Sequence, residues 1–125
     1  MSFDWVEYLF LAHQLTGQAV NPTDHEARLR TAVSRAYYAA FCKSRNHLRD
    51  REGSRIPHGV EAHQHVRDVF KRSNDRGWRQ IGQNLDRLRI DRNKVDYDDS
   101  IAGLDAMTCA DLVLADKVIA ALGRL

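Results

Sequence analysis

Glycine and proline are scarce in this 125-residue chain, which contains seven glycines and two prolines. Both residue types mark turns, and long stretches rich in Ala, Leu, Arg, Asp and Gln run without such a signal. Alternation of β-branched and polar residues, the pattern of half-buried strands, is also missing. The composition therefore predicts an all-α protein. The length suits a single domain over residues 1–125 with one hydrophobic core.

Cysteine is equally rare. Cys42 and Cys109 are isolated thiols within predicted helices, without CxxC spacing, so we expect two reduced, small core residues instead of a disulfide framework.

The N-terminus carries Asp4 and Glu7 where a signal peptide carries basic and then apolar residues. The most apolar segment, 101–122, is interrupted by three aspartates. The sequence predicts a cytoplasmic protein without a membrane segment.

Several catalytic and cofactor motifs are absent as well. The chain has no Gly-rich phosphate loop, no HExxH, no Ser/His/Asp order and no internal repeat. Three histidines, His58, His63 and His65, fall in a predicted third helix. At 100° per residue His58 and His65 share a face while His63 points about 140° away from His58, so the three do not form a metal site alone. We expect no metal and no other cofactor.

The net charge is only +2, but the charges are distributed unevenly. Residues 24–55 contain eight Arg or Lys and four Asp or Glu, whereas residues 1–23 and 100–125 are slightly acidic. A local basic band on a near-neutral protein suits a binding surface for an acidic partner. A solvated helix face gives the same pattern, so the sequence leaves both interpretations open.

Apolar spacing and capping signals predict five helices joined by short links. Their expected ranges are 3–16, 24–50, 58–72, 76–97 and 100–122. This order predicts an antiparallel up-and-down bundle of four to five helices. The last helix has apolar residues on most sides, which is typical of burial in the bundle centre or of a dimer seam.

One charged residue interrupts the apolar stripe of the fourth predicted helix. If residues 76–97 are helical, Arg92 falls in the middle of a stripe formed by Trp78, Ile81, Leu85, Leu88 and Val95. A guanidinium in apolar surroundings must be paired and hydrogen-bonded, because desolvating an ion costs on the order of several kcal/mol. Asp96, one turn further on, is the nearest candidate partner. The two residues form either a structural ion pair or part of a pocket or subunit interface where Arg92 meets a ligand.

The second predicted helix carries paired tyrosines. Ser34, Tyr37, Tyr38 and Phe41 lie within about one quadrant of its helical wheel. Tyrosines offer rigid apolar area, with hydroxyls that need partners when they are buried. These residues suit either core positions bonded to neighbouring helices or the wall of a ligand site.

Three segments resemble the HEPN superfamily, the small helical proteins of prokaryotic toxin–antitoxin, CRISPR and defence systems. Residues 32–41, AVSRAYYAAF, are similar to its second-helix signature of a serine and paired tyrosines before a phenylalanine. Residues 57–60, PHGV, resemble the His-x-Gly-Val that opens the third helix in a group of small HEPN proteins. That group's fourth-helix motif is similar to Leu88-Arg89-x-x-Arg92-Asn93-x-x-Asp96-Tyr97-Asp98. The resemblance covers roughly residues 24–122.

This resemblance implies a homodimer in which two fourth-helix motifs face each other across the seam. In the family's metal-independent ribonucleases the motif is an arginine, a polar residue, a few spacers and a histidine. Arg92 and Asn93 match its first part, but Asp96 or Asp98 stands where the histidine is expected. An aspartate with a pKa near ~4 is a far weaker base than imidazole at neutral pH. The motif therefore leaves open whether the chain is an enzyme.

Three functional hypotheses follow. In the first, a toxin-like member of a toxin–antitoxin or defence pair binds RNA or a nucleotide-bearing ligand in a dimer cleft, with Arg92 contacting phosphate. In the second, the same seam holds a nucleotidyltransferase-type partner without chemistry of its own. In the third, the protein is a divergent metal-independent ribonuclease that uses Arg92 with Asp96 or His58 as base. The expected ligand-contacting residues are Asn93, Tyr97, Ser34, Tyr37, Tyr38 and His58.

Overall fold

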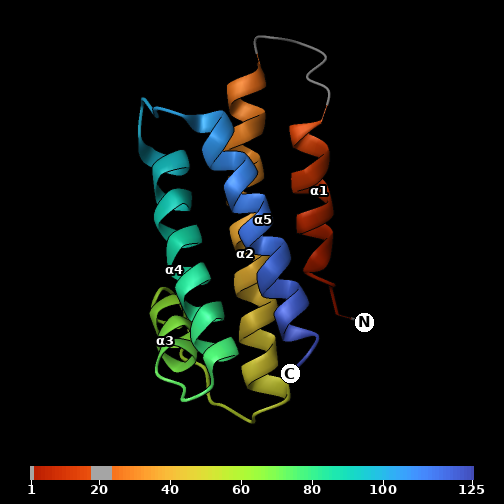
Figure 1. Cartoon of the computed structure of the whole chain (residues 1–125), viewed down its shortest axis with the longest axis vertical. Helices are drawn as coiled ribbons and strands as arrows, with labels where there is room; N and C mark the ends of the chain where they lie inside the picture. The colour runs from red at the N-terminus through yellow and green to blue at the C-terminus, as the bar shows by residue number, and fades with distance from the viewer. Residues whose placement is uncertain (1, 18–23) are drawn as a thin grey trace.

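The computed structural model describes residues 2–17 and 24–125, and all regular structure within them is helical (Figure 1). The helices are α1 (Val6–Thr16), α2 (His25–Asp50), α3 (Glu61–Lys71), α4 (Arg76–Tyr97) and α5 (Leu104–Leu122). The prediction of an all-α bundle is confirmed. In the described part of the chain, each helix is too short or too polar to cross a membrane.

The two glycines before α3 and α5 explain why these helices begin later than predicted. Gly59 has φ +75° and Gly103 has φ +69°, a left-handed conformation that a continuing helix does not contain. The backbone therefore turns at each glycine, and α3 starts at Glu61 and α5 at Leu104 instead of near residues 58 and 100.

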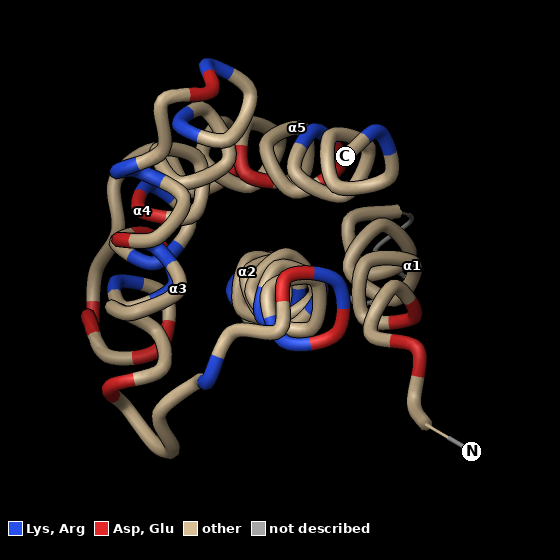
Figure 2. Tube along the Cα trace, turned by 90° about the horizontal axis from the view of Figure 1, so that it is seen from below, with Lys and Arg blue, Asp and Glu red and all other residues tan. Residues whose placement is uncertain are grey.

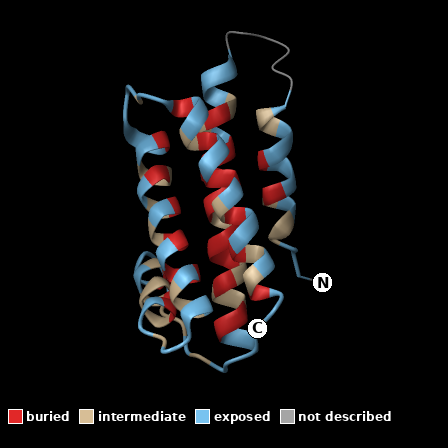
Figure 3. Cartoon of the chain, in the orientation of Figure 1, coloured by how far each residue is buried: buried red, intermediate tan, exposed pale blue. Residues whose placement is uncertain are grey.

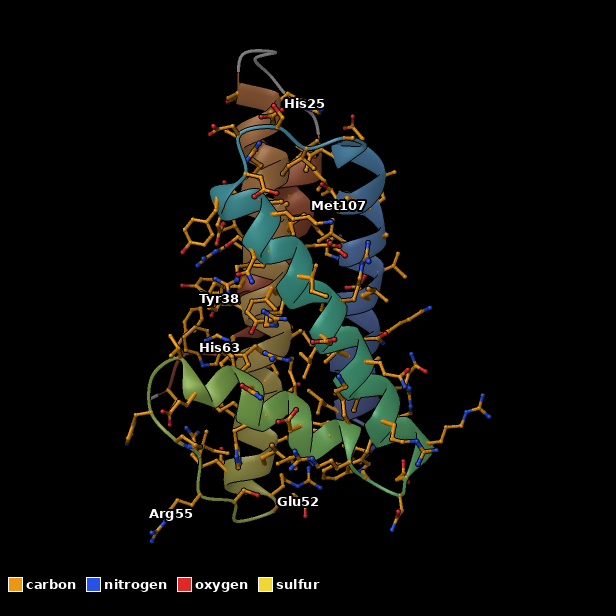
Figure 4. All side chains as sticks on the ribbon, turned by 90° about the vertical axis from the view of Figure 1, so that its left-hand side faces the viewer. His25, Tyr38, Glu52, Arg55, His63 and Met107 are labelled. Carbon is orange, nitrogen blue, oxygen red and sulfur yellow. The ribbon has the colours of Figure 1, made fainter. Side chains whose placement is uncertain are left out.

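The long helices alternate in direction. Figure 1 shows α1 and α4 running one way and α2 and α5 running the other way. The short α3 lies across the end of the bundle where α2 ends and α4 begins, as Figure 4 shows from another side. The crossing of α3 over α4 depends on Gly82, because a Cβ there would lie 2.7 Å from the backbone nitrogen of Lys71. The fold is an up-and-down bundle with one crossing helix.

The centre of the bundle is α2, which lies between α1 on one side and α3 and α4 on the other (Figure 2). Its alanines at positions 32, 36, 39 and 40 are fully buried and let neighbouring helices approach closely. Figure 3 shows buried positions along the inward faces of the helices. The last helix does not occupy the bundle centre: α5 lies beside α2 and leaves Val113 half exposed at 50%, and the alternative of a dimer seam stays a prediction.

The inward stripe of α4 contains the predicted residues and two polar ones. Ile81, Leu85, Leu88 and Val95 are buried, and Trp78 is half-buried. Asn84 and Asp91 are also buried, which the apolar pattern did not indicate. The prediction that both cysteines are core residues was wrong for one of them: Cys42 is buried, but Cys109 lies on an outward position of α5.

Candidate functional site

Arg92 lies on the face of α4 that packs against α2. Its guanidinium carbon is 5.1 Å from the ring centroid of Tyr37 and 5.5 Å from that of Tyr38. Contacts of this kind stabilise a cation through the ring quadrupole. Nη1 lies 3.8 Å from Oδ2 of Asp96, and the Arg92 side chain is 14% exposed. The expected pairing with Asp96 is therefore present, as a long ion pair at the rim of the bundle.

The Arg92 guanidinium is incompletely satisfied within the protein. Its Nε is buried and has no hydrogen-bond partner among the described residues. A buried donor without a partner costs free energy, and the Nε atoms of Arg28 and Arg89 are in the same situation. The two rings fix the position of the Arg92 guanidinium, and 14% of the side chain remains exposed.

Behind Arg92, Tyr37 joins α2 to α3. Tyr37 is fully buried, and its hydroxyl forms a short hydrogen bond with Nδ1 of His63. The His63 ring stacks on Phe41 with centroids 4.1 Å apart and an interplanar angle of 11°. Figure 4 shows His63 and Tyr38 near one another where α3 meets α2. A histidine from a different helix therefore lies next to the Arg92 site.

Burial sets the protonation of both groups in this hydrogen bond. It raises the pKa of Tyr37 to about 12, so the phenol keeps its proton at neutral pH. Burial, followed by the charge of Arg92, lowers the pKa of His63. The imidazole is therefore neutral at pH 7, and either it or the phenol can donate the shared hydrogen.

The other predicted site residues are distributed around this centre. Ser34 is buried and lines a shallow hollow that also includes Asp96. Asn93 is half-buried on α4, whereas Tyr97 is 77% exposed at the end of that helix. His58 lies before α3 and lines a separate groove beside Tyr38. The structure brings the Arg92 pair and the tyrosines together, but it places Tyr97 in solvent.

The groove beside Tyr38 has a volume of about 600 Å³. Its floor is α2, and its walls are the start of α1 and the segment that leads into α3. Its lining includes no acidic residue and consists of Trp5, Tyr8, Arg35, Tyr38, Phe41, Cys42, Arg45, Arg49, Ile56, Pro57, His58, Gly59, Ala62 and His63. Sequence reasoning missed most of this groove. Its signals in the sequence were the excess of basic residues in 24–55 and the expected ligand contacts Tyr38 and His58.

A second buried charged cluster lies on the other side of α4. Asp91 faces Asp111 of α5, and each is 1% exposed. Burial, followed by a hydrogen bond with Asp91, raises the pKa of Asp111 to about 8, so this carboxyl group holds a proton at pH 7. Arg87 partly compensates Asp91, with Nε 3.3 Å from Oδ2. No sequence pattern pointed to this pair.

Within residues 2–17 and 24–125, no three His, Cys, Asp or Glu side chains lie close enough together to hold a metal ion. His58 and His63 both line the groove beside Tyr38, and His63 also bonds Tyr37.

No protein-family model matches the chain, and no curated protein or solved structure is significantly similar to it. The HEPN resemblance therefore remains a prediction from its three motifs.

Proposed function

We propose that the protein binds RNA or a nucleotide-bearing ligand at Arg92, as the toxin-like member of a toxin–antitoxin or defence pair. The observation that supports this proposal is a guanidinium held against two tyrosine rings at the bundle rim, with Asp96 as its ion-pair partner at the long distance of 3.8 Å. Such ring contacts hold a cation in place without neutralising its charge.

Phosphate suits this arrangement. A guanidinium presents its donors in a planar fork that matches two phosphate oxygens, and the charge of Arg92 is only partly offset by Asp96 at 3.8 Å. A phosphate that approaches the exposed part of the Arg92 side chain competes with Asp96 for the N–H donors of the guanidinium. The proposal includes a homodimer, in which two Arg92 sites face a shared cleft.

The test compares the wild type with Arg92→Met by fluorescence anisotropy, using a labelled single-stranded RNA of mixed sequence. We expect at least a tenfold loss of affinity, because one charge-assisted phosphate contact is worth roughly 1.5–3 kcal/mol. The melting temperature should change by only a few degrees. Arg76→Met, at an exposed position in the first turn of α4, is the control and should bind as the wild type does.

Two outcomes contradict the proposal. The wild type fails to bind any RNA or nucleotide, or Arg92→Met unfolds the protein at the assay temperature. The second outcome identifies Arg92 and Asp96 as a structural ion pair. Sedimentation that gives only a monomer at micromolar concentration removes the shared cleft but leaves binding at a single Arg92 possible.

A second candidate function is metal-independent RNA cleavage, and the neutral His63 imidazole near Arg92 favours it. When Nδ1–H donates to the Tyr37 hydroxyl, the Nε2 lone pair can accept the proton of a ribose 2′-hydroxyl. The 2′-oxygen then bonds to phosphorus, the P–O5′ bond breaks, and the 5′-oxygen takes a proton from water. Cleavage in EDTA that is lost in His63→Gln, with RNA binding retained, supports this candidate. Intact RNA after prolonged incubation retires it.

A further inference from the structure

Two arginines of α2 are each held between aromatic rings from two different parts of the chain. The guanidinium carbon of Arg35 lies 4.8 Å from the Tyr8 ring centroid and 5.0 Å from that of Tyr38. The guanidinium carbon of Arg45 lies 5.5 Å from the Trp5 ring centroid and 6.0 Å from that of Phe41. Side chains that ordinarily move freely are thus fixed along the groove defined above.

The charges of these two arginines are not neutralised where they face the groove. Arg35 donates to the hydroxyl of Ser34 at 3.4 Å, and Arg45 donates to the amide oxygen of Asn46 at 3.1 Å. Both acceptors are neutral. Arg49, at the edge, differs because it pairs with Asp50 at 2.7 Å. The lining contains no carboxylate. The groove therefore has a positive potential that favours an anion.

Aromatic rings also line the groove, and a site that binds phosphate alone does not require them. Trp5, Tyr38, Phe41 and His63 contribute rings to its walls and floor, and its volume of about 600 Å³ lies within the range of small-molecule sites. Aromatic rings that alternate with cations are typical of surfaces on which unpaired bases stack while basic side chains follow the backbone.

We infer that this groove binds one unpaired nucleotide of single-stranded RNA, with the base against the aromatic wall and its two flanking phosphates near Arg35 and Arg45, one at each. The inference rests on the proposed function and specifies its ligand, because bases within a duplex are stacked on one another and cannot enter such a groove. Tyr38 links the two places, since Arg35 and Arg92 both lie against its ring. A strand that places one nucleotide in the groove presents a neighbouring phosphate to Arg92.

Trp5 provides a direct readout of base stacking. The chain has two tryptophans, so Trp78→Phe leaves Trp5 as the only indole. Four probes are compared: a single-stranded RNA octamer, its duplex, an abasic octamer with the same phosphates, and adenosine monophosphate. We expect strong quenching of Trp5 by the single strand and little by the duplex or abasic strand. If Trp78→Phe is unstable, the quenching lost between wild type and Trp5→Phe gives the same answer.

The charge is tested separately with Arg35→Gln/Arg45→Gln. Losing two phosphate contacts should weaken binding of the octamer at least tenfold and reduce the magnitude of the slope of log K against log salt by roughly 1.4, since each phosphate contact on a single strand contributes about 0.7. The control Arg72→Gln/Arg76→Gln removes two exposed arginines outside the groove lining and should retain nearly all of the affinity.

The outcomes separate this inference from the proposed function. A wild type that binds neither RNA nor adenosine monophosphate defeats the proposed function. Binding that depends on Arg92 but neither quenches Trp5 nor depends on Arg35 and Arg45 overturns the groove alone. Equal affinity for the octamer and adenosine monophosphate also overturns the inference, because the ligand is then a free nucleotide instead of a strand.

Discussion

Two neighbouring residues of α4 place opposite charges inside the bundle, and the protein treats them differently. Asp91 points toward α5, where it meets Asp111, and both side chains are 1% exposed. Arg92 points toward α2, rests on two tyrosine rings and keeps 14% of its side chain exposed. One turn of α4 thus carries one member of a fully buried acid pair and, next to it, a cation at the rim.

The difference shows what burial does to a charge when the available partners differ. Two carboxylates that share a dry site cannot both ionise cheaply, so Asp111 keeps its proton. An arginine does not lose its proton in a protein, so a tolerable position for it must include electron-rich rings, an acid or water. The acid pair is closed to solvent and suits a structural contact between α4 and α5. The rim position leaves the charge of Arg92 partly exposed.

The largest effect that we expect concerns the pH dependence of stability. Since the pKa of Asp111 is raised to about 8 from an ordinary value of 3.8, the folded protein retains a proton that the unfolded chain releases. Its contribution to stability therefore decreases as pH rises from about 4 to about 8 and is constant above that. Asp111→Asn removes this decrease and should be more stable than the wild type at pH 8, by roughly 3 kcal/mol.

Urea unfolding of the wild type and Asp111→Asn at pH 7 and 8 measures this effect, because the lowered histidine pKa values act mainly at more acidic pH and the raised pKa of the buried Cys42 thiol acts mainly at more alkaline pH. Asp99→Asn, at an exposed position after α4, is the control and should retain the slope of the wild type. A wild type whose stability does not change between pH 7 and pH 8 contradicts the protonated Asp111.

The second prediction concerns the tyrosines beneath Arg92. Tyr37→Phe removes the hydroxyl that bonds Nδ1 of His63 and should cost about 1 kcal/mol in the free energy of unfolding. Tyr38→Phe keeps the ring under Arg92 and removes a hydroxyl from a half-buried side chain, so it should change stability by less than about half that amount. Equal effects in chemical denaturation, measured at pH 7, indicate that the link between Tyr37 and His63 does not stabilise α3.

Helical periodicity was enough to predict the bundle and the unusual position of Arg92. The apolar stripe on residues 76–97 identified both the arginine and its partner Asp96, since both lie on one helix. The same periodicity did not predict the burial of Asp91, because a charged residue beside an apolar stripe is ordinarily expected to face solvent. Its burial depends on α5, which approaches that flank with another aspartate.

Contacts between helices also explain what the sequence did not reveal about the site. His63 reaches Tyr37 only because α3 crosses the end of α2, and no spacing within α3 encodes that crossing. The groove depends on Trp5 and Tyr8, which are far in sequence from the arginines that they contact. Local patterns predict helix faces, whereas the docking of those faces decides which side chains share a site.

The smallest expected effect tests whether Arg92 acts on His63 through its charge. Burial is the main cause of the low pKa of His63, and the positive charge of Arg92 is the next. Arg92→Met should therefore raise the pKa of His63 toward its ordinary value without restoring it fully, because burial persists.

An NMR titration of the imidazole protons measures this change in pKa, with His63→Gln to assign the resonance and Arg76→Met as a control of equal charge change. His47 is an internal reference, since its pKa is lowered mainly by burial elsewhere in the bundle. If both histidines shift equally, Arg92→Met has loosened the whole bundle. The change at His63 then does not come from the lost charge of Arg92.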